Sequence, residues 1–420
     1  MCRIAMICVH SCPLAMPGIE DAGGMNVYVR ELSRELGKNG MGIDIFTRWI
    51  DPRIPQVVPL GDHARVIHLK AGPLEAIPKN RVFQHLPEFI CSLRRFKEEQ
   101  HLHYRLLHSH YWLSGWVAGL LRQRWNVPHV AMFHTLGALK NRARPEENES
   151  IQRIETEHKI IASADVLVVS SDDEKSQMVS LYGAKPDSIR VVPCGVDLDR
   201  FRPLDRLEAK RNLGLKGSPA LLFVGRIEPL KGVDLLLDVV AELREQFANL
   251  HLLVLGGEAS PSPGRASRNG ELRHLENQVQ RLGVAENVSF VGAIDQEKLP
   301  LYYNAADICV VPSHYESFSL VAAEALACGT PVVASKVGGL QSLVVDHHNG
   351  LLVPWRSPQA FATEISLLLR NEELRNHLAL AARESVFPLG WSAIAKDILG
   401  IYDELAEAAV DNELCLCGRW

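Results

Sequence analysis

The sequence lacks any apolar run that approaches the roughly 18 residues a membrane-spanning helix requires, so we expect no membrane span. It also lacks an excess of positive charge. Its 420 residues carry a formal net charge of −5, which argues against a general attraction to nucleic acid or to an anionic membrane surface. A site for an anionic ligand must therefore be built locally, from a few cations and backbone N–H groups.

The nine cysteines include no Cys-x-x-Cys pair, and several lie inside apolar runs, where a free thiol packs as a small hydrophobic group. We therefore expect a reducing, cytoplasmic compartment. The N-terminal segment MCRIAMICVHSCP has too short an apolar part for a signal peptide, so it is expected to form a buried first strand. The Cys-x-Cys pair in the final segment ELCLCGRW is expected to lie in a frayed end.

Signatures of several other functions are missing as well. The Pro- and Ser-rich segment 258–271 lacks the Gly-Lys-Ser/Thr ending of a phosphate-binding P-loop and is predicted to be a surface loop. The adjacent histidines of DHHNG (346–350) would seldom both face one ion, so a loop is expected there rather than a metal site. We find no other cluster with metal-ligand spacing, and no internal repeat with a period of roughly 20–50 residues.

What the sequence does contain is a regular alternation of short apolar strands and amphipathic helices. The strand candidates fall into two series, which are RIAMICV, IDIFTR, LLHSHY, PHVAMFH, ADVLVVSS and SIRVVPCGVD, and then PALLFVGRI, NLHLLVLGG, NVSFVG, DICVVPS and TPVVASKV. Strands that are apolar on both faces indicate parallel sheets covered by helices on both sides. We therefore predict an α/β protein with two doubly wound domains joined near residues 193–203, and a ligand site in the cleft beyond the strand ends.

A glycine pair, Gly23 and Gly24, precedes a helix that is expected to begin near Asn26. Paired glycines let the backbone approach a ligand closely, and the free N–H groups at a helix N-terminus favour an anion. An ordinary strand–helix turn is the alternative. Asp21 and Asn26 are interpreted either as helix caps or as ligands of substrate hydroxyl groups.

Two cations follow the first strand of the second series. Arg226 comes just after this strand, and Lys231 lies at the start of the next helix. Both side chains can reach the strand end, which is a suitable arrangement for a diphosphate. Solvated charges at the ends of the two elements are the alternative.

Glu316 and Glu324 bracket an apolar run at the junction of a loop and a helix. Eight helical residues rise about 12 Å, which is comparable to the span from a nucleotide ribose to a sugar attached through a diphosphate. Free N–H groups near Phe318 to Leu320 are available to hold phosphate oxygens between the two carboxylates. A capping acid plus a surface glutamate is the alternative, which the nearby segments VGR…KG and PVVAS disfavour.

The segment ESFSLVAAE resembles the Glu-x7-Glu motif of retaining, nucleotide-sugar-dependent glycosyltransferases of family 4, which have the GT-B fold. VGRIEPLKG, FVG, AADICVVPS and GTPVVASKVGG are also similar to the family's motifs and follow in its order. The resemblance implies an N-terminal acceptor-binding Rossmann-like domain over 1–195 and a nucleotide-sugar-binding domain over 196–395, facing a central cleft. A C-terminal helix over 396–420 is implied to pack back on the first domain.

The resemblance also implies roles for single residues. The implied catalytic set is His134 beside the anomeric carbon, Arg226 and Lys231 on the diphosphate, and Glu316 on the hexose hydroxyls. The family needs no metal or other cofactor, because the departing phosphate takes the proton of the acceptor and the UDP-sugar is a co-substrate. The implied donor-binding residues are Gly23, Gly24, Arg226, Lys231, Val291, Gly292, Glu316, Ser317, Phe318, Ser319, Leu320 and Glu324.

On the acceptor side, the N-terminal half resembles two branches of the family. One transfers N-acetylglucosamine from UDP-N-acetylglucosamine to inositol 3-phosphate, and the sucrose-phosphate synthases join UDP-glucose to fructose 6-phosphate. Both branches bind small-molecule acceptors that carry a phosphate, and neither implies a nucleic-acid partner or a particular oligomeric state. The implied acceptor-binding residues are His10, Asp21, Asn26, Lys79, Tyr111, Thr135, Lys140 and Arg153.

One departure bears on the choice of acceptor. When this chain is aligned with the inositol 3-phosphate branch through QRIETEH, the arginine that clamps the inositol phosphate in that branch falls on Gln152. Arg153 is one place further. A helical residue one place on points about 100° away. Because HTLGALK, RIETEH and DIFTRWI also resemble sucrose-phosphate synthase segments, we favour sucrose 6-phosphate synthesis, although GGMN departs from that branch. Inositol 3-phosphate glycosylation, another family-4 transfer in glycan synthesis, and a catalytically silent GT-B module remain as alternatives.

Overall fold

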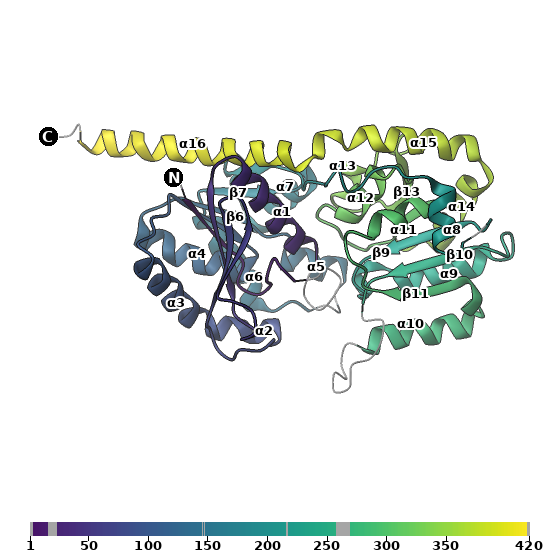
Figure 1. Ribbon diagram of the computed structural model, residues 1–420, viewed down its shortest axis with the longest axis horizontal. Helices are drawn as coiled ribbons and strands as arrows, with labels where there is room; N and C mark the ends of the chain where they lie inside the picture. The colour runs from purple at the N-terminus through teal and green to yellow at the C-terminus, as the bar shows by residue number, and fades with distance from the viewer. Residues whose placement is uncertain are drawn as a thin grey trace.

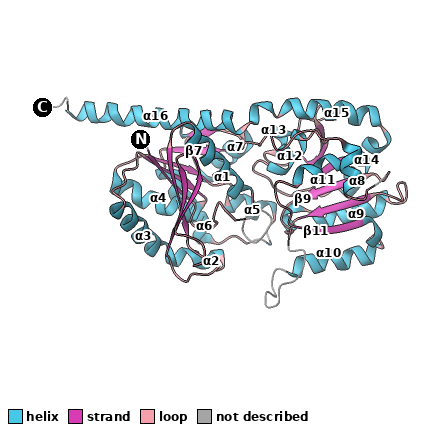
Figure 2. Cartoon of the chain, viewed as in Figure 1, coloured by secondary structure: helices cyan, strands magenta, loops and turns pink. Residues whose placement is uncertain are grey.

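The computed structural model describes residues 3–15, 23–144, 146, 148–215, 217–257 and 269–417, with side chains of the final helix described as far as residue 407. Two α/β units lie next to each other along the long axis of the molecule, and the last helix runs along one edge of the first unit (Figure 1). In each unit helices flank a central sheet (Figure 2).

The first unit contains an eight-stranded sheet in the order β3-β4-β2-β1-β5-β6-β7-β8. All neighbouring strands in it are parallel except β3 and β4, which pair antiparallel at one edge. The strands are β1 (Arg3–Ile7), β2 (Gly42–Arg48), β3 (Val57–Gly61), β4 (Ala64–Leu69), β5 (Leu106–His110), β6 (His129–Met132), β7 (Val166–Val169) and β8 (Ile189–Val191).

Helices cover both faces of this sheet because its strands are apolar on both faces. Along β1, Ile4 and Met6 face one apolar core, whereas Ala5 and Ile7 face the other, as the period of two in a strand requires. The helices of the first unit are α1 (Gly24–Lys38), α2 (Lys79–Val82), α3 (Leu86–Glu99), α4 (Trp112–Trp125), α5 (Gly137–Ala143), α6 (Ile151–Ser163) and α7 (Asp172–Tyr182).

The second unit contains a six-stranded, entirely parallel sheet in the order β11-β10-β9-β12-β13-β14. Its strands are β9 (Ala220–Val224), β10 (His251–Leu255), β11 (Val288–Gly292), β12 (Ile308–Val311), β13 (Val332–Ser335) and β14 (Gly350–Val353). Its helices are α8 (Arg206–Asn212), α9 (Val233–Leu243), α10 (Asn269–Leu282), α11 (Leu299–Ala305), α12 (Leu320–Ala327), α13 (Leu340–Leu343), α14 (Pro358–Arg370) and α15 (Glu372–Ser385).

Helix α16 (Trp391–Cys417) follows the second unit but packs against α1 of the first, and it begins ahead of the boundary expected at residue 396. The Trp391 ring lies 5.7 Å from that of Tyr28, and the hydroxyl of Tyr402 lies 2.7 Å from Nδ1 of His108. A Cβ on Gly195 would approach the Trp391 ring to 2.4 Å, so the chain can pass beneath this ring only as glycine. The polypeptide therefore crosses between the units twice, near Val196 and near Gly390.

The predicted α/β fold class is confirmed, with three differences among the elements. Strands β3, β4 and β14 were not predicted, because β3 is largely exposed and β4 carries Arg65 and His68 in its apolar pattern. The loop predicted over 258–271 is wrong for its last residues, since α10 begins at Asn269; residues 258–268 lie outside the described part of the chain. The frayed end predicted around Cys415 and Cys417 is also wrong, because α16 continues through Cys417.

Two absences hold for the described part of the chain. Its helices include none that combines the length and the apolar character needed to cross a membrane. Its His, Cys, Asp and Glu side chains form no group of three that is arranged to hold a metal ion.

Candidate active site

A cavity of about 280 Å³ lies between the two units, and it is lined by residues that follow the C-terminal ends of strands in both sheets. In the first unit these residues follow β1, β4, β5, β6 and β8, and in the second unit they follow β9, β10, β11 and β12. The sequence-predicted residues that the structure brings together here are His10, Gly23, Gly24, Lys79, Tyr111, His134, Thr135, Arg226, Lys231, Glu316, Ser317, Phe318, Ser319, Leu320 and Glu324.

Lys231 and Glu316 form an ion pair on the second unit's side of the cavity. The Nζ atom of Lys231 lies 2.6 Å from Oε1 of Glu316, and Ser313 donates to the same oxygen at 2.8 Å. Lys231 ends the 3-10 turn η4 (Pro229–Lys231), and the next residue, Gly232, has a φ of 70°. A Cβ on Gly232 would approach the carbonyl oxygen of Pro312 to 2.3 Å, so glycine lets the loops after β9 and β12 pack directly together.

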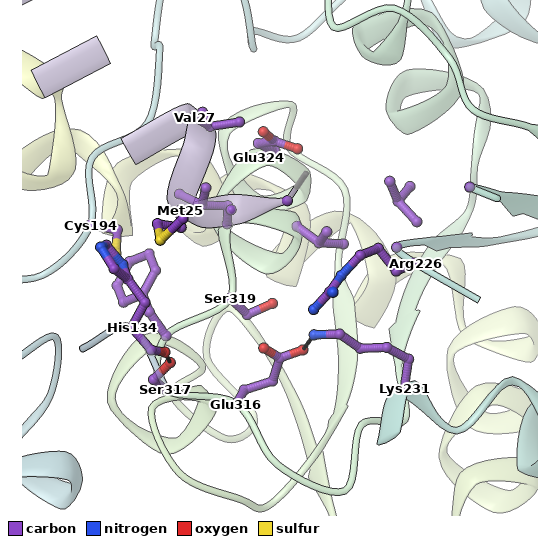
Figure 3. A pocket seen from close by; sticks show the side chains of 18 of the residues that line it. Met25, Val27, His134, Cys194, Arg226, Lys231, Glu316, Ser317, Ser319 and Glu324 are labelled. Atoms are coloured by element: carbon purple, nitrogen blue, oxygen red, sulfur yellow. Dashed lines mark hydrogen bonds and ion pairs between the residues drawn. The ribbon is translucent and has the colours of Figure 1, made fainter. Parts of the chain in front are cut away.

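Arg226 extends from the second unit toward the first. Its guanidinium lies 2.7 Å from Glu228, and a Cβ on Gly23 would come within 3.5 Å of its Nε. Figure 3 shows the ends of Arg226 and Lys231 directed into the region beside Glu316 and Ser319. Two cations therefore converge on one part of the cavity, where they can neutralise an anionic group.

The N-termini of two helices face this same region from opposite sides. A Cβ on Gly24, the first residue of α1, would meet the Leu320 side chain at 3.4 Å, and Leu320 is the first residue of α12. Free N–H groups and the helix dipoles add positive potential at both N-termini. Together with the two cations, they make this part of the cavity a site for a phosphate or diphosphate.

Three residues that line the cavity have positive φ angles although they are not glycine. The φ angles are 76° for Tyr111, 61° for His134 and 97° for Ser319. Each such residue costs on the order of 1–3 kcal/mol and persists only where its surroundings enforce it. Ser319 is held in part by its own side chain, which accepts a hydrogen bond from the N–H of Ala322 and caps α12. Strain gathered around one cavity is typical of a functional site.

Glu324 lies in α12 at the other end of the phosphate region and is only 6% exposed. The hydroxyl of Tyr303 donates to its Oε2 at 2.8 Å. Burial raises the pKa of Glu324 to about 7, although the Tyr303 hydrogen bond opposes this shift. The carboxyl group is therefore poised to change its ionisation when a ligand binds near neutral pH.

The histidines on the first unit's side of the cavity are held neutral. Burial lowers the pKa of His134 to about 3, and its Nε2 lies 3.0 Å from Nδ1 of His110. The His10 ring lies 4.3 Å from the Tyr111 ring, and burial together with the charges of Lys79 and Arg153 lowers the pKa of His10. These rings therefore act as neutral polar groups over the ordinary pH range.

Among the described residues, five that the sequence predicted do not line the cavity, and one of them is Arg153. Its side chain is 2% exposed and is paired with Glu157 at 2.7 Å and with Glu149 at 2.9 Å. It also donates to the carbonyl oxygen of Thr135 at 2.8 Å, and its guanidinium carbon lies 4.8 Å from the Tyr111 ring centre. Arg153 therefore supports Thr135 and Tyr111 from behind, and its contact with the acceptor's phosphate stays a prediction.

Lys140 and Asn26 are placed away from the cavity in a similar way. Lys140 pairs with Glu149 at 2.6 Å. The buried Asn26 side chain accepts from the N–H of Gly23 and donates to Ser11 and Cys12. Of the two interpretations of Asn26, the structure shows the cap. Asp21 lies outside the described residues.

Val291 and Gly292, which were expected to hold the base, also lie outside the lining. Val291 lies in a bulge, because Val254 pairs with Phe290 and Leu255 pairs with Gly292, so Val291 is an extra residue in the ladder. Ala293, Ile294 and Gln296 line the cavity instead. They follow the predicted strand NVSFVG, so their position after a strand end was the signal that could have identified them as lining residues. Met25, Val27, Cys194, Val224, Gly225, Leu255, Gly256, Leu299 and Val321 also line the cavity and were not predicted.

Two Rossmann-like units that face a cleft, with cations and two helix N-termini converging beside a glutamate, define a sugar-transferring enzyme with the GT-B fold. Residues 205–385 match the family model described as glycosyl transferases group 1, and residues 22–200 match the model described as glycosyltransferase family 4. The chain belongs to the family-4 glycosyltransferases, and the predicted family and GT-B fold are thereby confirmed.

Individual relatives are similar along the whole chain. A curated protein from Catenulispora acidiphila, named D-inositol 3-phosphate glycosyltransferase 2, is 42% identical over 428 residues that cover 98% of each chain. A solved structure of sucrose-phosphate synthase from Thermosynechococcus elongatus is 39% identical, covers 97% of this chain and 100% of its own, and has a TM-score of 0.90. A structure of Anabaena HepE in complex with UDP-glucose is 18% identical and covers 96% of this chain and 99% of its own. Its TM-score is 0.76, and it supports the fold alone.

Proposed function

We propose that the protein transfers N-acetylglucosamine from UDP-N-acetylglucosamine to inositol 3-phosphate, with retention of the anomeric configuration. The observation that carries the transfer chemistry is the convergence of Arg226, Lys231 and the N-termini of α1 and α12 on one region of the cavity. The choice of acceptor is supported by the relative of that name, which is 42% identical over 98% of both chains. The relatives therefore favour an alternative from the sequence analysis over the sucrose 6-phosphate synthesis favoured there.

The donor is proposed to lie along α12, with its diphosphate between two carboxylates. Glu316 accepts hydrogen bonds from the hexose hydroxyls, and Glu324 accepts them from the ribose hydroxyls. The diphosphate lies against Arg226, Lys231 and the helix N-termini. Each well-placed donor of this kind stabilises the charge that develops on the leaving group by roughly 3–4 kcal/mol. The two cations supply positive charge for departing UDP, so we propose that the transfer proceeds without a metal cofactor.

The acceptor is proposed to lie on the first unit's side of the cavity, where Lys79, Tyr111 and Thr135 line it beside His10. The Lys79 ammonium lies 5.9 Å from the Tyr111 ring centre, so its charge is held over the face of that ring. Lys79 and the Thr135 hydroxyl are suitable ligands for the phosphate of the acceptor. Attack occurs on the face from which UDP departs, and the departing phosphate takes the proton of the acceptor hydroxyl.

Sucrose 6-phosphate synthesis is the second candidate. It is supported by the 39% identity and the TM-score of 0.90 to sucrose-phosphate synthase. Both candidates use a phosphorylated acceptor, so they differ in the donor hexose and in the shape of the acceptor rather than in the phosphate chemistry. A cytoplasmic location is proposed for either one, because Cys8, Cys12, Cys91, Cys194, Cys309 and Cys328 are free thiols.

A crossed substrate experiment tests the proposal. The protein is incubated with each of the two UDP-sugars and each of the two acceptor phosphates, with and without EDTA, and the products are identified by mass. We expect a new product and release of UDP only with UDP-N-acetylglucosamine and inositol 3-phosphate. Product from UDP-glucose and fructose 6-phosphate alone would establish the second candidate. No product in any combination would contradict the acceptor class, and loss of activity in EDTA would contradict the metal-free proposal.

A further inference from the structure

The ring of His134 is held from behind by a second histidine. His110 ends β5, is 0% exposed, and places its Nδ1 3.0 Å from Nε2 of His134, which follows β6 and lines the cavity. The two ring centres lie 5.2 Å apart. His134 was predicted from the sequence and His110 was not, and the proposed transfer does not use His110 directly.

The bond between the rings contains one hydrogen, because both rings are neutral. Burial lowers the pKa of His134 to about 3, and burial with the neighbouring His108 and His134 rings lowers the pKa of His110. A neutral imidazole has one N–H and one bare nitrogen. Either His110 donates from Nδ1 to a bare Nε2 of His134, or His134 donates from Nε2 to a bare Nδ1 of His110.

The other nitrogen of His110 decides between these arrangements. Its Nε2 is buried and has no hydrogen-bond partner among the described residues. The His108 ring lies tilted beside it with ring centres 4.4 Å apart, and the Tyr28 ring meets it edge-on at 5.8 Å. A buried N–H without a partner is rarer in proteins than a bare acceptor without one. His110 therefore has its hydrogen on Nδ1, and its bare Nε2 is the buried atom.

We propose that His110 is a positioning residue that fixes the tautomer of His134, so that His134 presents an N–H at Nδ1 toward the cavity. No described residue is bonded to Nδ1 of His134, which leaves this hydrogen for a ligand. Under the proposed function, on which this inference rests, His134 donates a hydrogen bond to an oxygen of the sugar. With Nδ1 protonated and Nε2 bonded to His110, His134 is not the base that takes the acceptor's proton.

Nitrogen-15 NMR of the protein labelled at histidine measures the tautomer directly, without substrates. The signals of His134 are assigned by their loss in His134→Gln. We expect Nδ1 to show the shift of a protonated nitrogen and Nε2 that of a bare one. A hydrogen on Nε2, or a doubly protonated ring near neutral pH, would overturn the inference. Because no turnover is involved, this result is independent of whether the proposed transfer is correct.

Variants then test whether His110 is the cause. His110→Asn keeps an N–H on an atom bonded to Cγ, as Nδ1 is, whereas His110→Ala removes it. We expect His110→Asn to keep the Nδ1–H tautomer of His134 and a kcat within about threefold of the wild type. We expect His110→Ala to give a mixture of tautomers and a kcat lower by about tenfold or more, with the donor KM nearly unchanged. Equal losses in both variants, or an unchanged tautomer in His110→Ala, would overturn the inference.

A matched control exists on the same two strands. His129 in β6 is 0% exposed, its Nε2 lies 2.7 Å from Ser109 Oγ in β5, and its Nδ1 is buried without a partner among the described residues. His129→Asn disturbs the same sheet to a similar degree but does not touch His134. It is expected to leave the NMR signals of His134 unchanged. A tautomer change in this control equal to that in His110→Ala would assign the effect to the sheet rather than to His110.

Discussion

Ser317 donates a hydrogen bond from its Oγ to the backbone carbonyl oxygen of His134, across the cleft between the two units. The carbonyl oxygen of Ser317 in turn accepts from the hydroxyl of Ser170 at 2.9 Å. Ser317 follows Glu316 directly, so the loop that carries this carboxylate is attached to the first unit at two points. The position of Glu316 relative to His134 therefore depends on how closely the units approach each other.

Ser317→Ala is expected to lower kcat by about 3- to 10-fold, because a neutral hydrogen bond contributes about 0.5–1.5 kcal/mol. The measurement is steady-state kinetics of the transfer, with hydrolysis of the UDP-sugar in the absence of acceptor followed in parallel. Ser170→Ala removes the second link, and a double-mutant cycle gives the coupling between the two. An unchanged kcat in both single variants would show that these hydrogen bonds do not position Glu316.

Lys231→Ala is expected to lower kcat by about 100-fold or more, because it removes a charge from the leaving group and leaves Glu316 unpaired. Lys210→Ala is the matched control. Lys210 pairs with Asp307 at the same 2.6 Å, its side chain is 12% exposed compared with 21% for Lys231, and it lies in the same unit outside the cavity. The control should lower the melting temperature and leave kcat within about twofold. Similar kinetics in the two variants would remove Lys231 from the proposed diphosphate site.

Binding of UDP is expected to release protons from Glu324 near pH 7. The pKa of this carboxyl is about 7 in the free protein because it is buried. Hydrogen bonds donated by ribose hydroxyls favour the ionised form and lower the pKa, so affinity should rise as the pH increases from about 6 to 8. Calorimetry in two buffers of different ionisation enthalpy measures the proton release.

Glu324→Gln separates this effect from the ionisation of UDP itself. The variant keeps the shape of the side chain but cannot release a proton, so the difference between the two proteins belongs to Glu324. Identical proton release in both would exclude a ribose contact to this carboxylate.

Stability is expected to fall as the pH decreases from about 6.5. Burial lowers the pKa of His108, His129 and His134 to about 3, whereas in the unfolded chain each has its ordinary value of 6.5. The unfolded state therefore binds more protons between these values, and each histidine removes about 1.4 kcal/mol of stability per pH unit. Glu324 has the opposite effect, because its raised pKa stabilises the fold as the pH falls from about 7 toward 4.5.

Urea denaturation at several values between pH 7.5 and pH 5 measures the free energy of unfolding and its slope. His129→Asn should lower this slope by about one proton, because it removes a histidine that lies outside the cavity. A free energy of unfolding that does not change between pH 6.5 and pH 5 would contradict the prediction.

The sequence was sufficient to predict the parts of the site that follow directly from strand ends. Arg226 comes after β9 and Glu316 after β12, and in a parallel sheet both strand ends meet at one edge. Position along the chain does not reveal a side chain's final contacts. Arg153 was expected near a phosphate. Its guanidinium is bound by Glu149, four residues earlier, and by Glu157, four residues later, in a buried network.

The remaining differences arise from tertiary geometry that leaves no simple pattern. Val291 is an extra residue in β11, and apolar periodicity does not report such a bulge. The contact between Ser317 and His134 joins residues that are far apart in sequence and belong to different units. Partners of this kind become evident only when both sheets are placed together.

The position of α16 has a consequence for synthesis on the ribosome. Tyr28 and His108 belong to the first unit, yet Trp391 and Tyr402, which cover them, are translated only after the whole second unit. A nascent first unit therefore emerges with an uncovered apolar surface along α1. Its assembly is completed only after Trp391 and Tyr402 have left the exit tunnel, so a chain that stalls or terminates before them exposes a surface that chaperones can bind.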